Sequence, residues 1–271
     1  YGAEVAASPA EVGRLCKAVI TIIPDGRIVR EVAIGENGLA KGMARDSILI
    51  EMSSSAPGGT KTLGAELAKQ GIRMIDAPVS GGVKRAVSGQ LAIMIGGEAG
   101  DIERCRPVLA AMGTQIFQAG GLGAGHAIKC LNNFVSAAGY YAAAEALVAG
   151  KRFGLDPQVM LDVINASSGM NNSTQNKFAQ FVISRSFGSG FSIGLMAKDL
   201  RTALDLAHDD FARRFVEIYA TCGSHQIDDY FVGHSHDGVF SDLTGFQFTD
   251  CLVGKNFESE ENLRLIVLRI L

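Results

Sequence analysis

The sequence predicts an α/β protein: a doubly wound parallel sheet, followed by an all-helical domain that begins with a long helix. Over residues 1 to about 120, short apolar runs alternate with helical stretches, an order typical of doubly wound parallel sheets. A long alanine-rich stretch follows, and no proline occurs between residues 158 and 271. Because the pattern changes near residue 121, we expect two domains, 1–121 and 122–271.

Four short apolar runs are expected to form the strands of the sheet. Each is rich in β-branched residues or in Met and Leu, and each stops at Pro, Gly or Ser. Continuous apolar runs of this length are typical of strands buried on both faces. The predicted strands are AVITIIPD (18–25), SILIEMSS (47–54), GIRMIDAP (71–78) and LAIMIGG (91–97).

Two helices are expected between these strands. Residues 8–17 begin with Ser8, a proline follows, and Glu11 stands three residues after Ser8, which predicts a capping box. Residues 56–71 predict a second helix that Gly71 ends.

The second half of the chain is expected to be helical throughout. A run of about 28 residues from His126, rich in Ala and without Pro, predicts a long and mostly buried helix that ends at Gly154. The segments LDVINASS (161–168) and MAKDLRTALDLAHDDFARRFVEIYA (196–220) also have helical spacing.

Composition excludes several classes of protein. Lys and Arg number 25 against 28 Asp and Glu, so no bulk positive charge is available to hold nucleic acid or an anionic membrane. Five cysteines without a CxxC pair argue against a disulfide framework or a zinc site and favour a reducing, cytoplasmic compartment. No apolar window approaches the roughly 18–20 residues of a membrane helix.

The segment DAPVSGG (76–82) is a candidate anion site because it lies where a predicted strand ends. Ligands of open α/β sheets bind beyond the carboxyl ends of the strands. Ser80 supplies a hydroxyl group, and Gly81 and Gly82 let peptide N–H groups approach an anion without a Cβ in the way. A carboxylate cradle and a tight turn whose glycines serve geometry alone are both compatible with this pattern. Asp76 itself is expected to be a capping or turn carboxylate rather than a base.

Lys129 is a candidate acid–base residue on the long helix. It is surrounded by Ala, Ile, Cys, Leu and Phe, and Asn133 follows four residues later on the same helix face. Desolvation lowers the pKa of a lysine and makes it a usable proton donor or acceptor near neutrality. A lysine that snorkels at the edge of a packing face would give the same pattern.

Lys198 and Asp199 interrupt a further apolar helix and form the third candidate group. Adjacent residues point about 100° apart on a helix, so we expect them not to form one simple intrahelical pair. An interdomain salt bridge is the alternative to a role at a cleft.

Weaker signals lie elsewhere. IPD (23–25) and SSSAP (53–57) end two predicted strands on the same sheet edge as 76–82, where they could contact a cofactor or form ordinary turns. His234 and His236, with Asp237, could suggest a metal, but histidines in a Gly-rich loop are more often solvated. No metal site is therefore expected.

Three motifs in order resemble the β-hydroxyacid dehydrogenase family, which includes 3-hydroxyisobutyrate dehydrogenase, tartronate semialdehyde reductase and glyoxylate/succinic semialdehyde reductases. The resemblance covers about residues 1–210. It implies a Rossmann-type NAD(P)-binding domain, an all-α domain like the C-terminal domain of 6-phosphogluconate dehydrogenase, and homodimers or homotetramers built through the helical part. It also implies NAD or NADP as cofactor, no metal, and a small carboxylic acid as substrate. The motifs are DAPVSGGVKRAVSGQLAIMIGG (76–97), GLGAGHAIKCLNN (121–133) and GLMAKDL (194–200).

The resemblance also implies roles for individual residues. Lys129 matches the catalytic lysine, which donates a proton to the carbonyl during reduction and accepts it during alcohol oxidation. Asn133 matches the amide that helps to hold substrate and lysine. The substrate-carboxylate loop falls on Ser80, Gly81 and Gly82, and the cofactor-contacting positions fall on Ile23, Pro24, Ser54 and Lys198, with Asp199 beside the last.

The chain departs from the family at both ends. No GxGxxG occurs, so we expect the chain to begin after roughly 40 residues of the usual Rossmann start and to bind NAD(P) poorly unless that segment is supplied. After about residue 208 the family's closing helices are not recognisable, and the tail is rich in Phe and His.

Two classes of function remain open from the sequence. One is an NAD(P)-dependent oxidoreductase that interconverts a short β-hydroxy acid and its semialdehyde, with tartronate semialdehyde or glyoxylate reductase as alternatives within the family. The other is a non-catalytic relative that serves as a binding or dimerisation scaffold.

Overall fold

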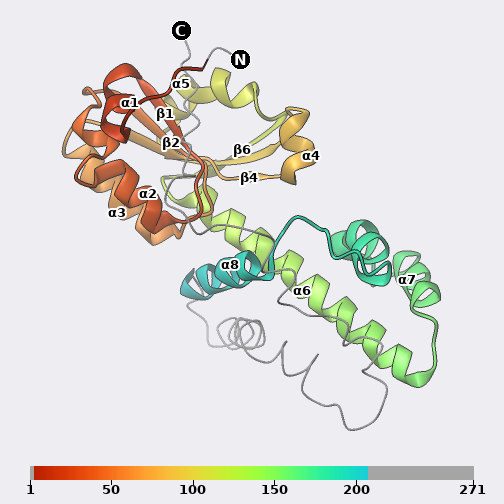
Figure 1. Ribbon diagram of the computed structural model, residues 1–271. Helices are drawn as coiled ribbons and strands as arrows, with labels where there is room; N and C mark the ends of the chain where they lie inside the picture. The colour runs from red at the N-terminus through yellow and green to blue at the C-terminus, as the bar shows by residue number, and fades with distance from the viewer. Residues whose placement is uncertain (1–2, 207–271) are drawn as a thin grey trace. The chain divides into compact units, whose positions relative to one another are not determined.

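The computed structural model describes residues 3–206 of the chain. These residues form two compact units, of which the first ends at Cys130 and the second begins at Leu131. Figure 1 shows a sheet flanked by helices in the first unit and helices in the second. The predictions for the tail after residue 208, including those for His234 and His236, lie outside the described residues.

The first unit is built on a six-stranded sheet in which the strand order is β1-β2-β3-β5-β4, with β6 beside β5. The first three strands are parallel, and all four predicted strands form within their predicted ranges. The predicted α/β class with a parallel, Rossmann-like sheet is confirmed. The strands are β1 (Ala18–Thr21), β2 (Ile48–Glu51), β3 (Arg73–Asp76), β4 (Val79–Ser80), β5 (Ala92–Gly96) and β6 (Gln115–Gly120).

Strands β5 and β6 run in the opposite direction to the other four strands. Both β3 and β4 pair with β5 antiparallel, in one register that joins Asp76 to Gly96 and Val79 to Ile93. Pro78, between β3 and β4, has no N–H to donate and interrupts the ladder. Only the short helix α4 (Gly82–Val87) lies between β4 and β5, so the chain doubles back instead of making the long crossover that a parallel connection needs. Strands β5 and β6 are parallel to each other.

Helices cover both faces of this sheet, as Figure 1 shows. Leu49 and Met74 point into a core formed with three helices and a short 3₁₀ turn, whereas Ile50 and Ile75 point into a second core formed with α5. This alternation along β2 and β3 explains why both strands are apolar throughout. The helices of the first core are α1 (Pro9–Leu15), α2 (Gly26–Ile34) and α3 (Pro57–Ala68), with the turn η1 (Leu39–Lys41), and α5 spans Ala99–Ala110.

Local signals fix where these helices begin and end. The hydroxyl of Ser8 accepts a hydrogen bond from the N–H of Glu11, as the capping box predicts. The Glu11 carboxylate, however, accepts from the N–H of Ala7 rather than from that of Ser8, so the reciprocal bond falls one residue earlier. Gly71 follows α3 with a φ of 75°, which a residue with a side chain rarely adopts.

The second unit is helical over the residues that the structure describes. Leu147, Leu161 and Phe178 are buried together. The centroids of the Tyr140 and Phe178 rings lie 5.0 Å apart. A separate small core joins Ala137 to Leu200. The elements are α6 (Ala124–Phe153), which begins in the first unit, α7 (Pro157–Asn165), the π-helical segment η2 (Thr174–Ile183) and α8 (Ile193–Leu206).

The long helix α6 is present, and Gly154 follows it with a φ of 98°. The prediction that this helix is mostly buried is wrong for the described part of the chain, because most of its side chains are exposed or half-buried. An alanine-rich composition favours a helix but does not say how many of its faces are covered. No helix among residues 3–206 combines the length and the apolar character needed to cross a bilayer.

Candidate functional site

Two buried carboxylates stand side by side at the carboxyl ends of β2 and β3. Glu51 ends β2 and Asp76 ends β3, the two residues are register partners, and both are 0% exposed. Buried carboxylates are costly unless hydrogen bonds and opposite charge compensate them. The start of α6 supplies both.

Asp76 caps helix α6 from outside the helix. Its Oδ1 accepts a hydrogen bond from the N–H of Gly123 at 2.6 Å, and its Oδ2 accepts one from the N–H of His126 at 2.7 Å. The first N–H groups of a helix have no partner within the helix, so these bonds satisfy two of them. The predicted capping role of Asp76 is confirmed.

The imidazole of His126, 1% exposed, connects α6 to β2 and α3. Its Nε2 lies 2.8 Å from Glu51 Oε2 and 3.1 Å from the carbonyl oxygen of Ser53. Both neighbours are acceptors, so Nε2 carries a proton. The Nδ1 atom lies 2.8 Å from Thr60 Oγ1. We call Glu51, Asp76, His126 and Thr60 the α6 anchor.

The two carboxyls of the α6 anchor respond differently to burial. Burial acts to raise the pKa of Glu51, but the hydrogen bond and the charge of His126, with the bonds from Ser53, outweigh it, so that pKa lies below its usual value. For Asp76, burial prevails over the charge of His126 and the N–H groups of Gly123 and His126, and its pKa is raised.

Helix α6 approaches the sheet so closely that only glycine fits at residue 125. A Cβ added to Gly125 would lie 2.3 Å from the carbonyl oxygen of Met94, on β5, and 2.8 Å from Asp76 Oδ2. Lys129, which is half-buried, follows four residues later and shares this helix face. The α6 anchor and Gly125 therefore fix the helix turn from which Lys129 extends.

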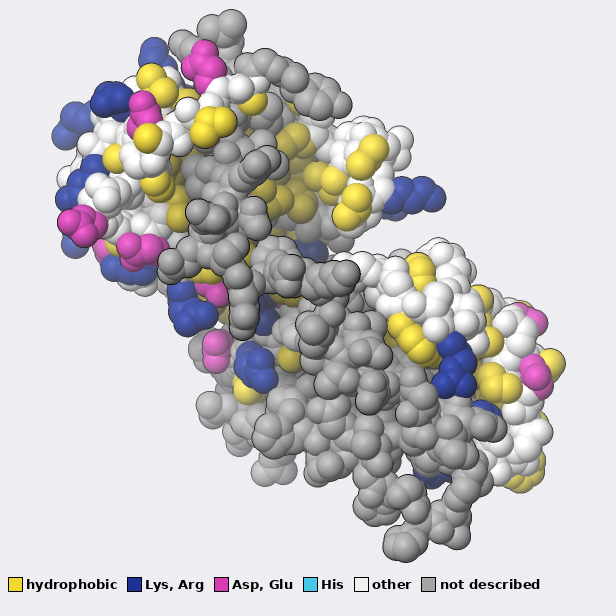
Figure 2. Space-filling model, viewed as in Figure 1, with side chains coloured by type: hydrophobic (Ala, Val, Ile, Leu, Met, Phe, Trp, Pro, Cys, Tyr) yellow, Lys and Arg dark blue, Asp and Glu magenta, His cyan; other side chains and the backbone are white. Residues whose placement is uncertain are grey.

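The loop 80–82 adopts a backbone that requires its glycines. Gly81 and Gly82 have φ values of 134° and 63°, and a Cβ added to Gly82 would meet nothing within 4 Å. Both glycines are exposed, and Ser80 before them is half-buried. The loop leads into α4, where Val83 and Val87 are 79% and 84% exposed. Figure 2 shows hydrophobic side chains with a basic side chain beside them at this end of the sheet.

The predicted cofactor-contacting segments meet at the ends of β1 and β2. The N–H of Ile23 donates to Ser53 Oγ at 3.0 Å, which places 23–25 and 53–57 on one edge, as predicted. Pro24 is exposed, and Ser54 is half-buried. Among the described residues, Thr21 Oγ1 and Ser55 Oγ on this edge are buried without a hydrogen-bond partner. Exposed apolar side chains on this edge, such as Ile22, suit the face of a planar ring such as nicotinamide.

Asn133, Lys198 and Asp199 come together in the second unit. The amide nitrogen of Asn133 donates to Asp199 Oδ2 at 2.6 Å. Lys198 Nζ lies 3.3 Å from Asp199 Oδ1, so the expectation that these neighbours do not pair within the helix is wrong. The lysine side chain is long enough to curve back across the 100° that separates the two positions.

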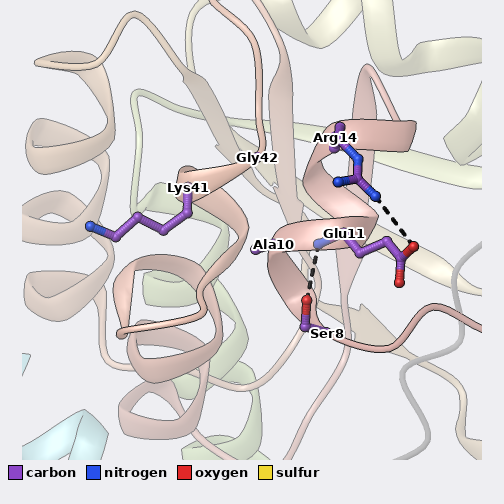
Figure 3. Close-up of a pocket in the computed structure, with 6 residues that line it drawn as sticks. All are labelled: Ser8, Ala10, Glu11, Arg14, Lys41 and Gly42. Atoms are coloured by element: carbon purple, nitrogen blue, oxygen red, sulfur yellow. Dashed lines mark hydrogen bonds and ion pairs between the residues drawn. The ribbon is translucent and has the colours of Figure 1, made fainter.

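A cavity between α1 and η1 is lined partly by side chains that pair with one another. Ser8 Oγ accepts from the N–H of Glu11, and the Glu11 carboxylate pairs with exposed Arg14 at 3.3 Å. Figure 3 shows that the Lys41 side chain points away from this pair. The described part of the chain holds no cluster of three His, Cys, Asp or Glu side chains arranged to bind a metal ion. The cavity is lined by Ser8, Ala10, Glu11, Arg14, Lys41 and Gly42.

Three members of the α6 anchor are not among the site residues that the sequence predicts. The sequence pattern places Glu51 in an apolar strand, Thr60 in a helix and His126 at the start of a long helix. A signal was present, because a carboxylate that ends a strand buried on both faces needs a partner. The sequence does not say which residue supplies it.

The chain matches known proteins over both units. Two family profiles align in succession, the NAD binding domain of 6-phosphogluconate dehydrogenase over residues 1–121 and the NAD-binding domain of NADP-dependent 3-hydroxyisobutyrate dehydrogenase over 123–220. Over 204 residues the chain is 35% identical to 2-(hydroxymethyl)glutarate dehydrogenase of Eubacterium barkeri, a match that spans 75% of this chain and 68% of that enzyme. The chain belongs to the β-hydroxyacid dehydrogenase family.

Other members of this family match the chain at a similar level of identity. Mouse mitochondrial 3-hydroxyisobutyrate dehydrogenase is 37% identical over 212 residues, which cover 76% of this chain and 63% of that enzyme. The structure of Mycobacterium tuberculosis 3-hydroxyisobutyrate dehydrogenase with L-serine is 32% identical, has a TM-score of 0.71, and covers 81% of this chain and 79% of that one. The named relatives and the NAD-binding profiles identify the chain as an NAD(P)-dependent hydroxyacid dehydrogenase.

Proposed function

We propose that the protein interconverts a short β-hydroxy acid and its semialdehyde, with Lys129 as general acid and base. The observation that carries this proposal is the position of Lys129, one turn beyond Gly125 on a helix whose start is bonded to the carboxyl ends of β2 and β3. Open α/β sheets bind their ligands at that edge. 3-Hydroxyisobutyrate is the first candidate substrate, and tartronate semialdehyde and glyoxylate are the alternatives.

The remaining roles follow the family resemblance. Ser80, Gly81 and Gly82 hold the substrate carboxylate, and Asn133 helps to position the substrate. Residues 1–121 bind NAD or NADP, residues 122–271 bind substrate and form the contacts of a homodimer or homotetramer, and no metal takes part. The cofactor is contacted by Ile23, Pro24, Ser54 and Lys198.

The chemistry divides between cofactor and protein. When bound, a nicotinamide cofactor would supply the hydride for reduction of the carbonyl group or accept it during oxidation of the alcohol. The ammonium group of Lys129 donates a proton to the carbonyl oxygen during reduction, and its neutral amine accepts the hydroxyl proton during oxidation. While charged, the same group stabilises negative charge that develops on that oxygen.

Turnover of a small panel of acids tests the proposed substrate class. Purified enzyme, supplied with the N-terminal Rossmann segment that the family resemblance implies, is mixed with 3-hydroxyisobutyrate, glycerate or glycolate and with NAD⁺ or NADP⁺, and formation of the reduced nicotinamide is followed by absorbance. We expect one acid to give a kcat/KM at least about tenfold above the others, the discrimination that one or two groups in a pocket provide. Saturable cofactor binding without turnover of any of these acids would contradict the proposal.

A further inference from the structure

We propose that His126 is a positioning residue for Lys129. Its imidazole ties the first turn of α6 to β2 and α3 and thereby sets the place from which the amine of Lys129 reaches the substrate carbonyl. This inference rests on the proposed function, since it assumes the acid–base role of Lys129.

His126 is bonded through both its backbone and its ring, to three different elements. Its N–H donates to Asp76 on β3, while its ring contacts Glu51 on β2 and Thr60 on α3. Contacts in three directions oppose sliding of the first turn of α6 along its axis and rotation about it. Lys129 stands three residues later, on the next turn, so its Cα position follows that of His126.

Polar groups face both nitrogens of the His126 ring. Glu51 Oε2 and the Ser53 carbonyl oxygen face Nε2, while Thr60 Oγ1 faces Nδ1 at 2.8 Å and Asp76 Oδ2 lies 3.5 Å from it. If Nδ1 donates to Thr60, the Thr60 hydroxyl is free to donate to the Ala56 carbonyl oxygen, which lies 3.2 Å away. The ring is thus held from both of its nitrogens, between two carboxylates that are otherwise shielded from water.

The same network reaches the predicted cofactor edge. Glu51 Oε1 accepts from the N–H of Ser53, and Ser53 Oγ accepts from the N–H of Ile23, which is one of the proposed cofactor-contacting residues. A continuous chain of bonds thus joins the edge that would hold the nicotinamide to the helix that carries Lys129. Hydride and proton transfer to one carbonyl group need both donors in a fixed relation, which a chain of this kind provides.

The test compares His126→Ala with a core variant of similar kind, Leu109→Ala. Leu109 is fully buried in the core around α5 and lies outside the proposed binding machinery. We measure kcat, KM and the pH–rate profile of the folded enzyme. A second readout needs neither cofactor nor substrate: the rate at which acetic anhydride acetylates Lys129, followed by peptide mass spectrometry.

His126→Ala should lower kcat by about 10²-fold, as misplacement by about 1 Å does, with KM within about threefold of wild type. The pH limb assigned to Lys129 should shift, and acetylation of Lys129 should become several-fold faster. Leu109→Ala should lower the melting temperature but leave kcat, the pH profile and the acetylation rate of the folded enzyme unchanged.

A wild-type kcat, pH profile and acetylation rate in folded His126→Ala would overturn the inference. If that variant does not fold, Thr60→Val decides, because it keeps the imidazole and removes the hydroxyl group that partners Nδ1 and the Ala56 carbonyl oxygen. The same changes, smaller in size, support the inference, and wild-type values overturn it. Lys129→Ala is assayed in parallel. Wild-type turnover in Lys129→Ala would refute the proposed function, whereas its inactivity beside wild-type-like His126→Ala would refute only the positioning role.

Discussion

Gly125→Ala is expected to destabilise the protein by about 3 kcal/mol and to lower kcat by about 10²-fold. The added Cβ would lie 2.3 Å from the Met94 carbonyl oxygen and 2.8 Å from Asp76 Oδ2. The first of these atoms belongs to a strand backbone and the second accepts a helix N–H, so neither can give way cheaply. The start of α6 must therefore lift from the sheet, and Lys129, on the same face one turn later, must move with it.

Gly100→Ala is the matched control for this change. Gly100 is also the second residue of a helix, α5, but a Cβ there would meet nothing within 4 Å. We expect this variant to gain about 0.5–1 kcal/mol, because alanine restricts the unfolded chain, and to keep its kcat. Chemical denaturation gives the free energies of unfolding, and equal stabilities of the two variants would show that α6 does not rest on β5 as described.

Asp76→Ala is expected to cost about 3–5 kcal/mol in the free energy of unfolding. The change removes the acceptors of two helix N–H groups, those of Gly123 and His126, and each buried unpaired group costs about 1–3 kcal/mol. It also leaves Glu51 as the single carboxylate facing the imidazole. Asp76→Asn keeps one acceptor oxygen and should lose about half as much. A loss below about 1 kcal/mol for Asp76→Ala would contradict the capping role.

The pH dependence of the Asp76→Asn difference has a definite sign. Burial raises the pKa of Asp76 in the folded protein above its unfolded value. The stability that this carboxyl contributes is therefore fully present below the unfolded pKa and is lost as the pH rises through the folded pKa. The advantage of wild type over Asp76→Asn should accordingly be larger in acid than at neutral pH. Urea unfolding of both proteins across the acid range measures this difference.

Much of the sheet was predictable because its strands bury both faces. Strands β1, β2, β3 and β5 appear in the sequence as short apolar runs. The predicted end of the third run, at DAPVSGG (76–82), coincides with the end of β3 at Asp76. Strand β6 was missed because its side chains are exposed or half-buried and give no apolar pattern. The reversal of β5 was missed because it depends on the tight return after Pro78 and not on the apolar pattern of the strand itself.

The sequence predicts the individual segments of the candidate site but not the contacts between them. Strand ends and an unusual lysine on an apolar helix are visible in the sequence, and the capping role of Asp76 follows from its place after a strand. The partnership of Glu51 with His126 is not visible, since the two residues are far apart in the chain and meet only because α6 starts over β2 and β3. The Lys198–Asp199 pair was misjudged because helical angles describe Cβ directions and not the reach of a long side chain.

Turnover by Lys129→Ala, with and without added ethylamine, tests the central claim most directly. Lys129 is half-buried, so alanine should leave the fold and cofactor binding intact. We predict that kcat falls by at least about 10³-fold, within the range that general acid–base catalysis contributes, and that a small primary amine restores part of it by replacing the missing proton donor. Turnover near the wild-type rate without added amine would contradict the claim that Lys129 is the acid and base of this enzyme.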